Sequence, residues 1–178
     1  MGDNIQTFRA IERKQLALSS QDVDLDVLVQ AVLQSLGPDL MMEQFEVDLD
    51  LRASTDSAPA IVRADPKLLE QVIRTLLSHA MKYSTTSRSI KLSSERDSDF
   101  ARLTVTDHGV GMTDDEQARV FEPFHRGANK EVRSTGAGLG MFIVKHVVEA
   151  SGGTIELRSE LGKGTMVSLT LPLLKAGL

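Results

Sequence analysis

The 178-residue sequence contains no cysteine and no tryptophan, and only one tyrosine. The lack of cysteine excludes disulfides and thiolate metal sites. No apolar run approaches the roughly 18 residues that a membrane-spanning helix needs, and the first residues are too polar for a signal peptide. We therefore expect a cytoplasmic segment without direct membrane contact, whose longer parent protein is free to carry a membrane anchor.

Positive charge is also scarce, since 20 Lys and Arg stand against 25 Asp and Glu, for a net charge of -5. General nucleic-acid binders present basic surfaces, so we expect no nucleic-acid partner. The apolar content of 41% and the charged content of 25% are typical of a globular domain large enough to form a core. A single nucleotide is not excluded, because its pocket needs only a few local cations.

Glycine, by contrast, is clustered in two places. Gly109 and Gly111 follow the acidic residue Asp107, and the second cluster, GAGLG, begins at Gly136 and precedes an apolar run from Met141. Alternating glycines let a ligand approach the main chain closely. A helix that begins after such a loop presents free N–H groups to an anion.

The segment between the two glycine clusters is cationic. It contains Arg126, Lys130 and Arg133, which can neutralise a polyphosphate. Together with the glycines, these residues predict a nucleotide-binding pocket with a mobile cover over about residues 112–136.

Apolar periodicity predicts the other elements. We expect helices over 24–36, 66–83, 113–121 and 139–150, and strands over 45–51, 60–62, 90–92, 101–106, 154–158 and 165–171. Gly37-Pro38 should end the first helix, and Asp65-Pro66 is a clear start signal for the second. The order indicates an α+β fold in which helices cover one face of a mixed, largely antiparallel sheet.

The predicted helix over 66–83 has a polar strip along one edge of its apolar stripe. Gln71, Thr75, His79 and Lys82 are spaced four, four and three residues apart, so they should face the same side. A ligand lying against this edge would meet all four side chains.

Residues 1–20 place Ile5, Phe8, Ile11 and Leu16 at roughly helical spacing, with no visible partner for the stripe. Two interpretations remain open. The segment is either the C-terminal stub of a helix whose other half lies upstream, or a frayed tail.

Four motifs in this order resemble the catalytic ATP-binding domain of sensor histidine kinases, within the Bergerat (GHKL) fold shared with gyrase, the Hsp90 chaperones and MutL. LLSHAMKYS is similar to the N box, DHGVG to the first glycine box, FEPF to the F box and GAGLG to the second glycine box. The resemblance covers about residues 24–172. It implies a two-layer α/β sandwich with a mobile ATP lid, in a domain spanning 21–178, and assigns residues 1–20 to the end of a helical phosphoacceptor hairpin.

The resemblance also implies a place for adenine. Asp107 would accept a hydrogen bond from the adenine amino group, Gly109 and Gly111 would let the base lie against the backbone, and Tyr83 would stack on it. The alternative role of Asp107 is that of a turn-forming aspartate, and the alternative role of Tyr83 is that of an ordinary core residue.

At the phosphate end, the resemblance implies that Lys82 and Arg126 contact the phosphates. The residues that would wrap the triphosphate at a helix N-terminus are Gly136, Gly138, Leu139 and Gly140. Lys130 and Arg133 have no counterpart in the family and are either lid cations or merely solvated charges. Phe121 and Phe124 suit hinge packing for the lid.

The N box departs from the family pattern, because Thr75 and His79 stand where two asparagines are usual. The resemblance makes Thr75, His79 and Lys82 the catalytic positions and His79 the position of a Mg²⁺ ligand, although Mg²⁺ prefers oxygen. Three interpretations remain open. In the first, His79 is a tolerated replacement, and phosphate oxygens and water hold Mg²⁺. In the second, the protonated His79 ring neutralises phosphate charge. In the third, the site binds nucleotide with little or no phosphotransfer.

The function implied is that of a two-component histidine kinase domain that uses ATP and Mg²⁺ and transfers the γ-phosphate to a histidine on a separate helical domain. The expected partners are that phosphoacceptor domain and a response-regulator receiver domain, within a homodimeric parent. One alternative is a degenerate kinase module that signals through protein contacts, and another is a serine kinase of the anti-sigma type. Thr75 cannot act as a general base on water, which disfavours free ATP hydrolysis.

Overall fold

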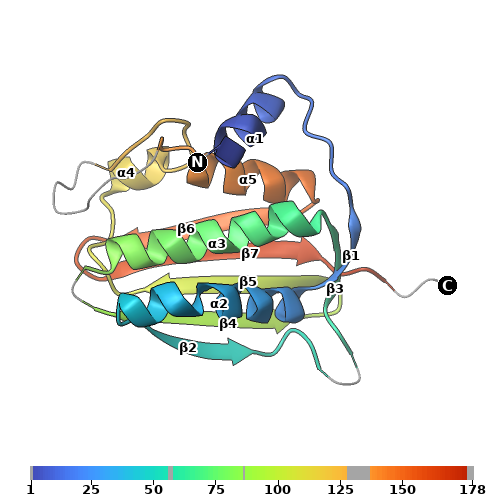
Figure 1. Ribbon diagram of the computed structural model, residues 1–178, viewed down its shortest axis with the longest axis horizontal. Helices are drawn as coiled ribbons and strands as arrows, with labels where there is room; N and C mark the ends of the chain where they lie inside the picture. Colours follow the sequence, from blue (N-terminus) through green and yellow to red (C-terminus); the bar gives the residue numbers. More distant parts are fainter. Residues whose placement is uncertain (1, 56–57, 86, 128–136, 176–178) are drawn as a thin grey trace.

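The computed structural model describes residues 2–55, 58–85, 87–127 and 137–175, with the side chains of residues 2 and 3 left out (Figure 1). The elements, in chain order, are α1 (Gly2–Glu12), β1 (Gln21–Asp24), α2 (Leu25–Met42), β2 (Glu46–Leu51), β3 (Ile61–Ala64), α3 (Pro66–Tyr83), β4 (Ser89–Arg96), β5 (Phe100–Asp107), α4 (Asp114–Arg119), α5 (Gly140–Ala150), β6 (Thr154–Glu160) and β7 (Gly164–Pro172). None of the helices in these ranges is long and apolar enough to cross a membrane.

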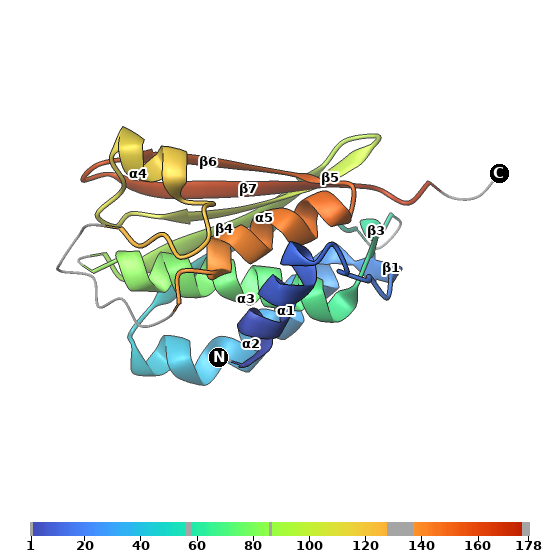
Figure 2. The same ribbon diagram turned by 90° about the horizontal axis from the view of Figure 1, so that it is seen from above.

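The principal sheet has five strands in the order β2-β4-β5-β7-β6. Only the β2–β4 pair is parallel, and the other neighbours are antiparallel. Figure 2 shows α2, α3 and α5 on one face of this sheet. The predicted fold class, a mixed and largely antiparallel sheet covered on one face by helices, is therefore confirmed.

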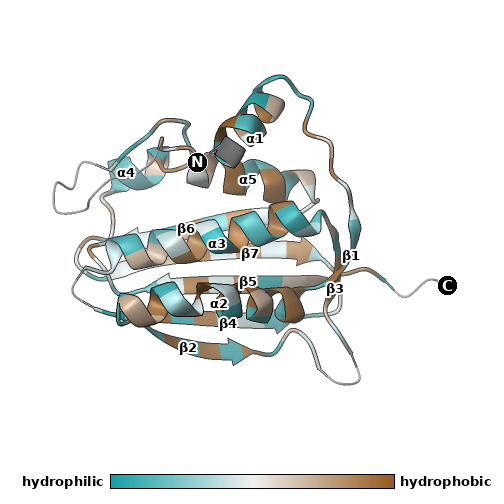
Figure 3. Cartoon of the chain, in the orientation of Figure 1, coloured by the Kyte–Doolittle hydropathy of each residue, from teal (hydrophilic) through white to brown (hydrophobic). Residues whose placement is uncertain are grey.

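The core lies between the sheet and these helices. Leu69, Ile73 and Leu77 of α3 are buried against the sheet, where Leu92 and Leu169 are also buried. Figure 3 shows β2 alternating between hydrophobic and hydrophilic residues, as its period-two pattern predicts. The burial of a continuous apolar face is what holds α3, and with it the polar edge of α3, in a fixed place.

Helix α3 begins and ends where the sequence predicts. The Oδ1 atom of Asp65 accepts hydrogen bonds from the backbone N–H groups of Lys67 at 3.0 Å and Leu68 at 3.2 Å, and Pro66 occupies the first turn. These bonds satisfy donors that would otherwise be unpaired at the helix N-terminus. The Oδ2 atom of Asp65 also accepts from the backbone N–H of Ser19 at 2.9 Å, which fixes the connection to α1.

In the first half of the chain one prediction is wrong and one strand is missed. Helix α2 does not end at Gly37-Pro38 but continues through Pro38 to Met42. The continuation buries Leu40, and burying a leucine side chain offsets much of the cost of one missing backbone hydrogen bond. Strand β1, which pairs with β3 in a separate two-stranded sheet, was not predicted.

Helix α1 has a partner that the sequence does not reveal. The ring of Phe8 meets the ring of Phe142 on α5 edge-on, with centroids 5.4 Å apart, and the ring of Phe124 at 5.2 Å. The helical interpretation of this segment is therefore confirmed over Gly2–Glu12. Its assignment to a phosphoacceptor hairpin stays a prediction.

Replacing Asp65 with alanine should lower the free energy of unfolding by about 1 kcal/mol, because the N-cap of α3 is lost. Asp65→Asn keeps a capping oxygen and should cost much less. Urea denaturation of both variants checks this, and an equal loss in the two would contradict the capping role.

Candidate functional site

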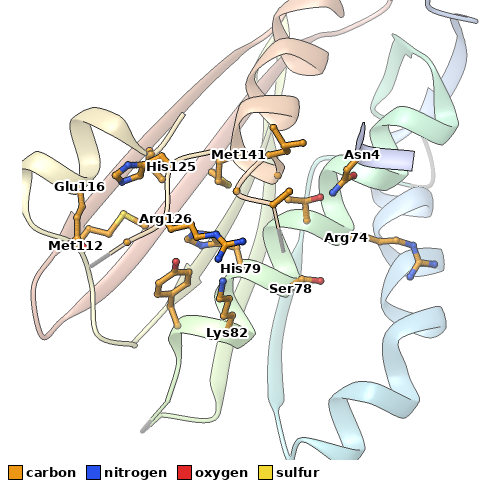
Figure 4. Close-up of a pocket in the computed structure, with 18 of the residues that line it drawn as sticks. Asn4, Arg74, Ser78, His79, Lys82, Met112, Glu116, His125, Arg126 and Met141 are labelled. Carbon is orange, nitrogen blue, oxygen red and sulfur yellow. The ribbon is translucent and has the colours of Figure 1, made fainter. Parts of the chain in front are cut away.

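A cavity of about 520 Å³ lies between α3, the beginning of α1, the segment after β5 and the beginning of α5. The predicted polar edge of α3 forms one wall, because Gln71, Thr75, His79 and Lys82 all line the cavity. Helical spacing alone was thus sufficient to group these four side chains. Figure 4 shows His79 and Lys82 on this wall with Arg126 beside them.

His79 is a neutral, half-buried ring in this wall. Burial, and secondarily the charge of Lys82, lowers its pKa from 6.5 to about 4. The ring lies against that of Tyr83, with centroids 4.4 Å apart and planes tilted by 34°. The interpretation in which a protonated His79 neutralises phosphate is therefore not supported at neutral pH.

Lys82 and Arg126 place two cations at the same cavity. Burial lowers the pKa of Lys82, and the nearby charge of Arg126 lowers it further. Like charges held this close repel each other, so an anion between them would be stabilised by both. The two residues predicted to contact phosphate are thus brought together by the fold.

The second glycine cluster forms the opposite wall. Gly138 has φ +69°, and a Cβ atom on it would lie 2.7 Å from the carbonyl oxygen of His125, so no larger residue fits. Leu139 is the N-cap of α5 but makes no side-chain capping hydrogen bond. Among the described residues no side chain caps the first N–H groups of α5, so they could donate to an anion in the cavity. Gly138, Leu139 and Gly140 line the cavity as predicted, while Gly136, Lys130 and Arg133 lie outside the described residues.

Asp107 lies at the end of β5, and only 4% of its surface is exposed. Its Oδ1 atom accepts hydrogen bonds from the backbone N–H groups of Gly109 at 2.9 Å and Thr165 at 3.3 Å. Burial raises the pKa of this carboxyl group, and the two hydrogen bonds oppose the rise. No hydrogen bond from the described part of the chain reaches Oδ2. Asp107 therefore forms the turn considered as its alternative role and still has one oxygen to offer an amino group.

The first glycine cluster is shaped by contacts within the protein. A Cβ atom on Gly109 would lie 2.0 Å from the carbonyl oxygen of Tyr83. Gly111 has φ +66°, and a Cβ atom on it would lie 2.0 Å from the carbonyl oxygen of Glu160. Gly111 and Tyr83 line the cavity, but Asp107 and Gly109 do not. The carboxylate predicted to bind adenine thus sits behind the cavity wall rather than in it.

Tyr83 is the last residue of α3 and lines the cavity. Burial raises the pKa of its hydroxyl group, and the charge of Glu116 on α4 raises it further. Its ring contacts His79 on one side. The alternative of an ordinary core tyrosine is not favoured, because the side chain lines the cavity.

No sequence pattern indicated that α1 contributes to the cavity. Asn4 and Ile5 line it, and the Oδ1 atom of Asn4 accepts a hydrogen bond from the Nε2 atom of Gln71 at 2.6 Å. Arg74 also lines the cavity but is directed toward α2, where it donates to the hydroxyl of Ser35 at 2.6 Å (Figure 4).

The side chains of this cavity do not form a Mg²⁺ site. Among the described residues there is no group of three or more His, Asp or Glu side chains placed to hold a metal ion. His79 offers a nitrogen where Mg²⁺ prefers oxygen, so the residue predicted to bind Mg²⁺ is a poor match for that ion.

Comparisons with known proteins identify relatives over most of the chain. The family model described as histidine kinase-, DNA gyrase B-, and HSP90-like ATPase matches residues 64–175. The sensor-like histidine kinase SenX3 of Mycobacterium tuberculosis is 34% identical over 98% of this chain and 42% of its own length. The circadian input-output histidine kinase CikA of Synechococcus elongatus is 30% identical over 96% of this chain and 22% of its own length.

Solved structures agree with this result. The histidine kinase AdeS of Acinetobacter baumannii matches with a TM-score of 0.75 at 26% identity, over 96% of this chain and 76% of AdeS. Full-length ShkA, crystallised with AMPPNP, matches with a TM-score of 0.80 at 25% identity, over 99% of this chain and 36% of ShkA. The chain spans less than half the length of the curated relatives named here.

The depressed pKa of His79 should make the protein lose stability on mild acidification. The unfolded chain takes up the proton near pH 6.5, whereas the folded chain does so only near pH 4, so stability falls as the pH drops through this window. Between pH 7 and pH 5 the loss from this group should be about 2 kcal/mol. Urea denaturation at both pH values checks this.

His79→Gln should remove this part of the pH dependence, and the same substitution at the exposed His108 is the matched control. If the free energy of unfolding fell by the same amount between the two pH values in His79→Gln and in the unmodified protein, the half-buried neutral ring of His79 would not be the cause.

Proposed function

Because the chain belongs to the family of histidine kinase-, DNA gyrase B- and HSP90-like ATPases, we propose that it is the ATP-binding catalytic domain of a sensor histidine kinase. In this proposal it presents the γ-phosphate of ATP to a histidine on a separate helical domain. The observation that carries the proposal is a single cavity where Lys82 and Arg126 face the uncapped beginning of α5. ATP binding itself follows from the family.

The cavity suggests how the nucleotide is oriented. The base would lie toward Tyr83 and Gly111. For its amino group to reach Oδ2 of Asp107, the wall that separates this carboxylate from the cavity would have to shift. The phosphates would lie between Lys82, Arg126 and the N–H groups of α5, where positive charge is concentrated. Catalysis of phosphoryl transfer consists largely of such positioning and charge neutralisation.

Thr75 points to transfer rather than hydrolysis. Its hydroxyl cannot remove a proton from water at neutral pH, so the wall of the cavity provides no general base at this position. The side chain of Thr75 instead lies next to the beginning of α5. A Cβ atom added to Gly140 would be 3.0 Å from Cγ2 of Thr75. We assign Thr75 a positioning role, with Lys82 as the residue in charge contact with the reacting phosphate.

The parent protein would supply the phosphoacceptor. Residues 1–20 would be the end of the helical hairpin that carries the acceptor histidine, and α1 docks beside the cavity through Phe8. The greater length of the matched relatives supports a longer parent. A homodimeric parent and a response-regulator receiver domain complete the proposed two-component system.

Mg²⁺ would accompany ATP as the metal–nucleotide complex. Phosphate oxygens and water would hold it, since the described residues present no oxygen cluster for it. The metal neutralises phosphate charge when bound, and the protein contributes Lys82, Arg126 and the α5 N-terminus to the same task.

The rival is a degenerate kinase module, which Thr75 and His79 suggest. The comparisons favour the kinase instead, because the matched relatives are named as histidine kinases. A serine kinase of the anti-sigma type is disfavoured by α1, which fits a helical hairpin. Incubation of the longer parent with labelled ATP separates these functions. Phosphohistidine supports the proposal. Phosphoserine on a separate protein supports the serine kinase, and no transfer at high Mg²⁺ supports the degenerate module.

Lys82→Met and Arg126→Met should each weaken ATP binding about 10- to 100-fold, as expected for loss of a charge-assisted contact. Binding of adenosine, which has no phosphate, should not change. Calorimetry of both ligands tests this, with the exposed Lys67→Met on the same helix as control. Equal effects on ATP and adenosine would contradict the phosphate role.

Asp107→Asn should change the preference of the site from adenosine to inosine. The carboxylate accepts from the 6-amino group of adenosine, whereas an asparagine amide can donate to the 6-oxo group of inosine while its oxygen keeps the bonds to the backbone N–H groups. Competition binding of the two nucleosides measures this. An unchanged preference in the variant would remove Asp107 from the base site.

A further inference from the structure

Met112 places an oxidisable sulfur atom in the cavity wall. The chain contains no cysteine and seven methionines, so sulfur oxidation on this chain can occur only at methionine. Met112 and Met141 line the cavity, and Figure 4 shows the sulfur atom of Met112 among the lining side chains. Met41 and Met42, by contrast, lie at the end of α2, with 80% and 77% of their surfaces exposed.

The backbone on both sides of Met112 is held in place. The residue before it, Gly111, has φ +66° and packs so closely that an added Cβ atom would lie 2.0 Å from the carbonyl oxygen of Glu160. The residue after it, Thr113, is the N-cap of α4. The carbonyl oxygen of Met112 accepts a hydrogen bond from Nε2 of Gln117 at 3.4 Å. A chemical change at the sulfur atom therefore has to be accommodated in the cavity wall itself.

Met112 lies at the end of the cavity proposed for the base. It directly follows Gly111, and the backbone N–H of Val110 donates to the carbonyl oxygen of Tyr83 at 3.1 Å. With 6% of its surface exposed, Met112 is otherwise packed in the protein. Its thioether presents a polarisable, apolar surface to a purine ring. A cavity of about 520 Å³ also admits molecules of the size of hydrogen peroxide.

A peroxide that enters the cavity can transfer one oxygen atom to Sδ of Met112. The O–O bond breaks and an S–O bond forms. The sulfur atom is oxidised by two electrons, and the peroxide is reduced to water, which keeps both of its hydrogens. The product is a sulfoxide, which replaces an apolar thioether with a polar group that accepts hydrogen bonds.

The sulfoxide oxygen would oppose nucleotide binding in either of two positions. Against a bound base it would be a polar atom without a partner, which costs free energy. If it instead accepted a hydrogen bond from Lys82 or Arg126, it would compete with the phosphates for that cation. The ionised carboxylate of Glu116, which also lines the cavity, has only acceptors and cannot pair with it.

We propose that Met112 is an oxidation site that regulates this cavity. The sulfoxide form binds ATP more weakly than the thioether form, and bound nucleotide protects the sulfur atom from peroxide. Methionine sulfoxide can be reduced back to methionine enzymatically, so the change is reversible. The inference rests on the proposed function, because it requires that ATP binds in this cavity.

Protection by nucleotide can be measured without any substitution. The protein is treated with hydrogen peroxide with and without saturating ATP, and peptide mass spectrometry follows the oxidation of each methionine. ATP should slow the oxidation of Met112 about fivefold or more, because susceptibility follows exposure. The exposed Met41 and Met42 should be oxidised at the same rate in both samples. Equal rates at Met112 with and without ATP would overturn the inference.

Calorimetry of ATP before and after peroxide treatment measures the consequence for binding. The affinity should fall about tenfold, as expected when a polar oxygen without a partner meets an apolar ligand surface, and methionine sulfoxide reductase should restore it. In Met112→Leu, which keeps a similar apolar volume without the sulfur atom, peroxide should not change the affinity. The double variant Met41→Leu with Met42→Leu is the matched control and should still lose affinity about tenfold.

The outcomes separate this inference from the proposed function. A loss of affinity in Met112→Leu equal to that of the protein without substitutions would overturn the role of Met112, as would a loss that disappears only in Met141→Leu. Both results leave ATP binding intact. If Met112→Leu fails to fold, the protection measurement decides. Failure of ATP to bind the untreated protein would overturn the inference and the proposed function together.

Discussion

The site depends on two cations, Lys82 and Arg126, which the fold brings to one cavity. One cation is fixed on α3 and the other on the segment before the second glycine cluster, and both face the same cavity. The uncapped beginning of α5 adds partial positive charge from the opposite wall. An anion in this cavity would be stabilised by both cations and by the helix N-terminus, and a triphosphate is such an anion.

The rest of the fold holds these charges in place. The apolar face of α3 is buried against the sheet, so its polar edge can only face the cavity. Asp65 caps the helix at one end, and at the other end the carbonyl of Tyr83 accepts a hydrogen bond from the backbone N–H of Val110 at 3.1 Å. Close backbone packing at Gly109 and Gly111 then connects α3 to the strand that ends in Asp107. Close backbone packing thus connects the buried carboxylate of Asp107 to the polar edge of α3.

Much of this could be predicted because it depends on local spacing. The boundaries of α3 follow from Asp65-Pro66, and the grouping of Gln71, Thr75, His79 and Lys82 follows from the helical period. Helix α4 likewise lies within the predicted range 113–121, and a capping box between Thr113 and Glu116 begins it. What failed depends on contacts distant in sequence. The docking of α1 relies on Phe8 meeting Phe142 and on Asn4 meeting Gln71, and no periodicity encodes such pairs. The passage of α2 through Pro38 depends on a burial site for Leu40 that only the folded core provides.

The most direct test of the account is an NMR titration of the isotope-labelled protein with tripolyphosphate and then with ATP. Tripolyphosphate alone should shift the backbone amides of Leu139, Gly140 and Met141 and the side-chain signals of Lys82 and Arg126, and ATP should add shifts at Asp107 and Tyr83. Shifts from tripolyphosphate that are spread over other surface lysines, with the α5 amides unmoved, would contradict the central claim.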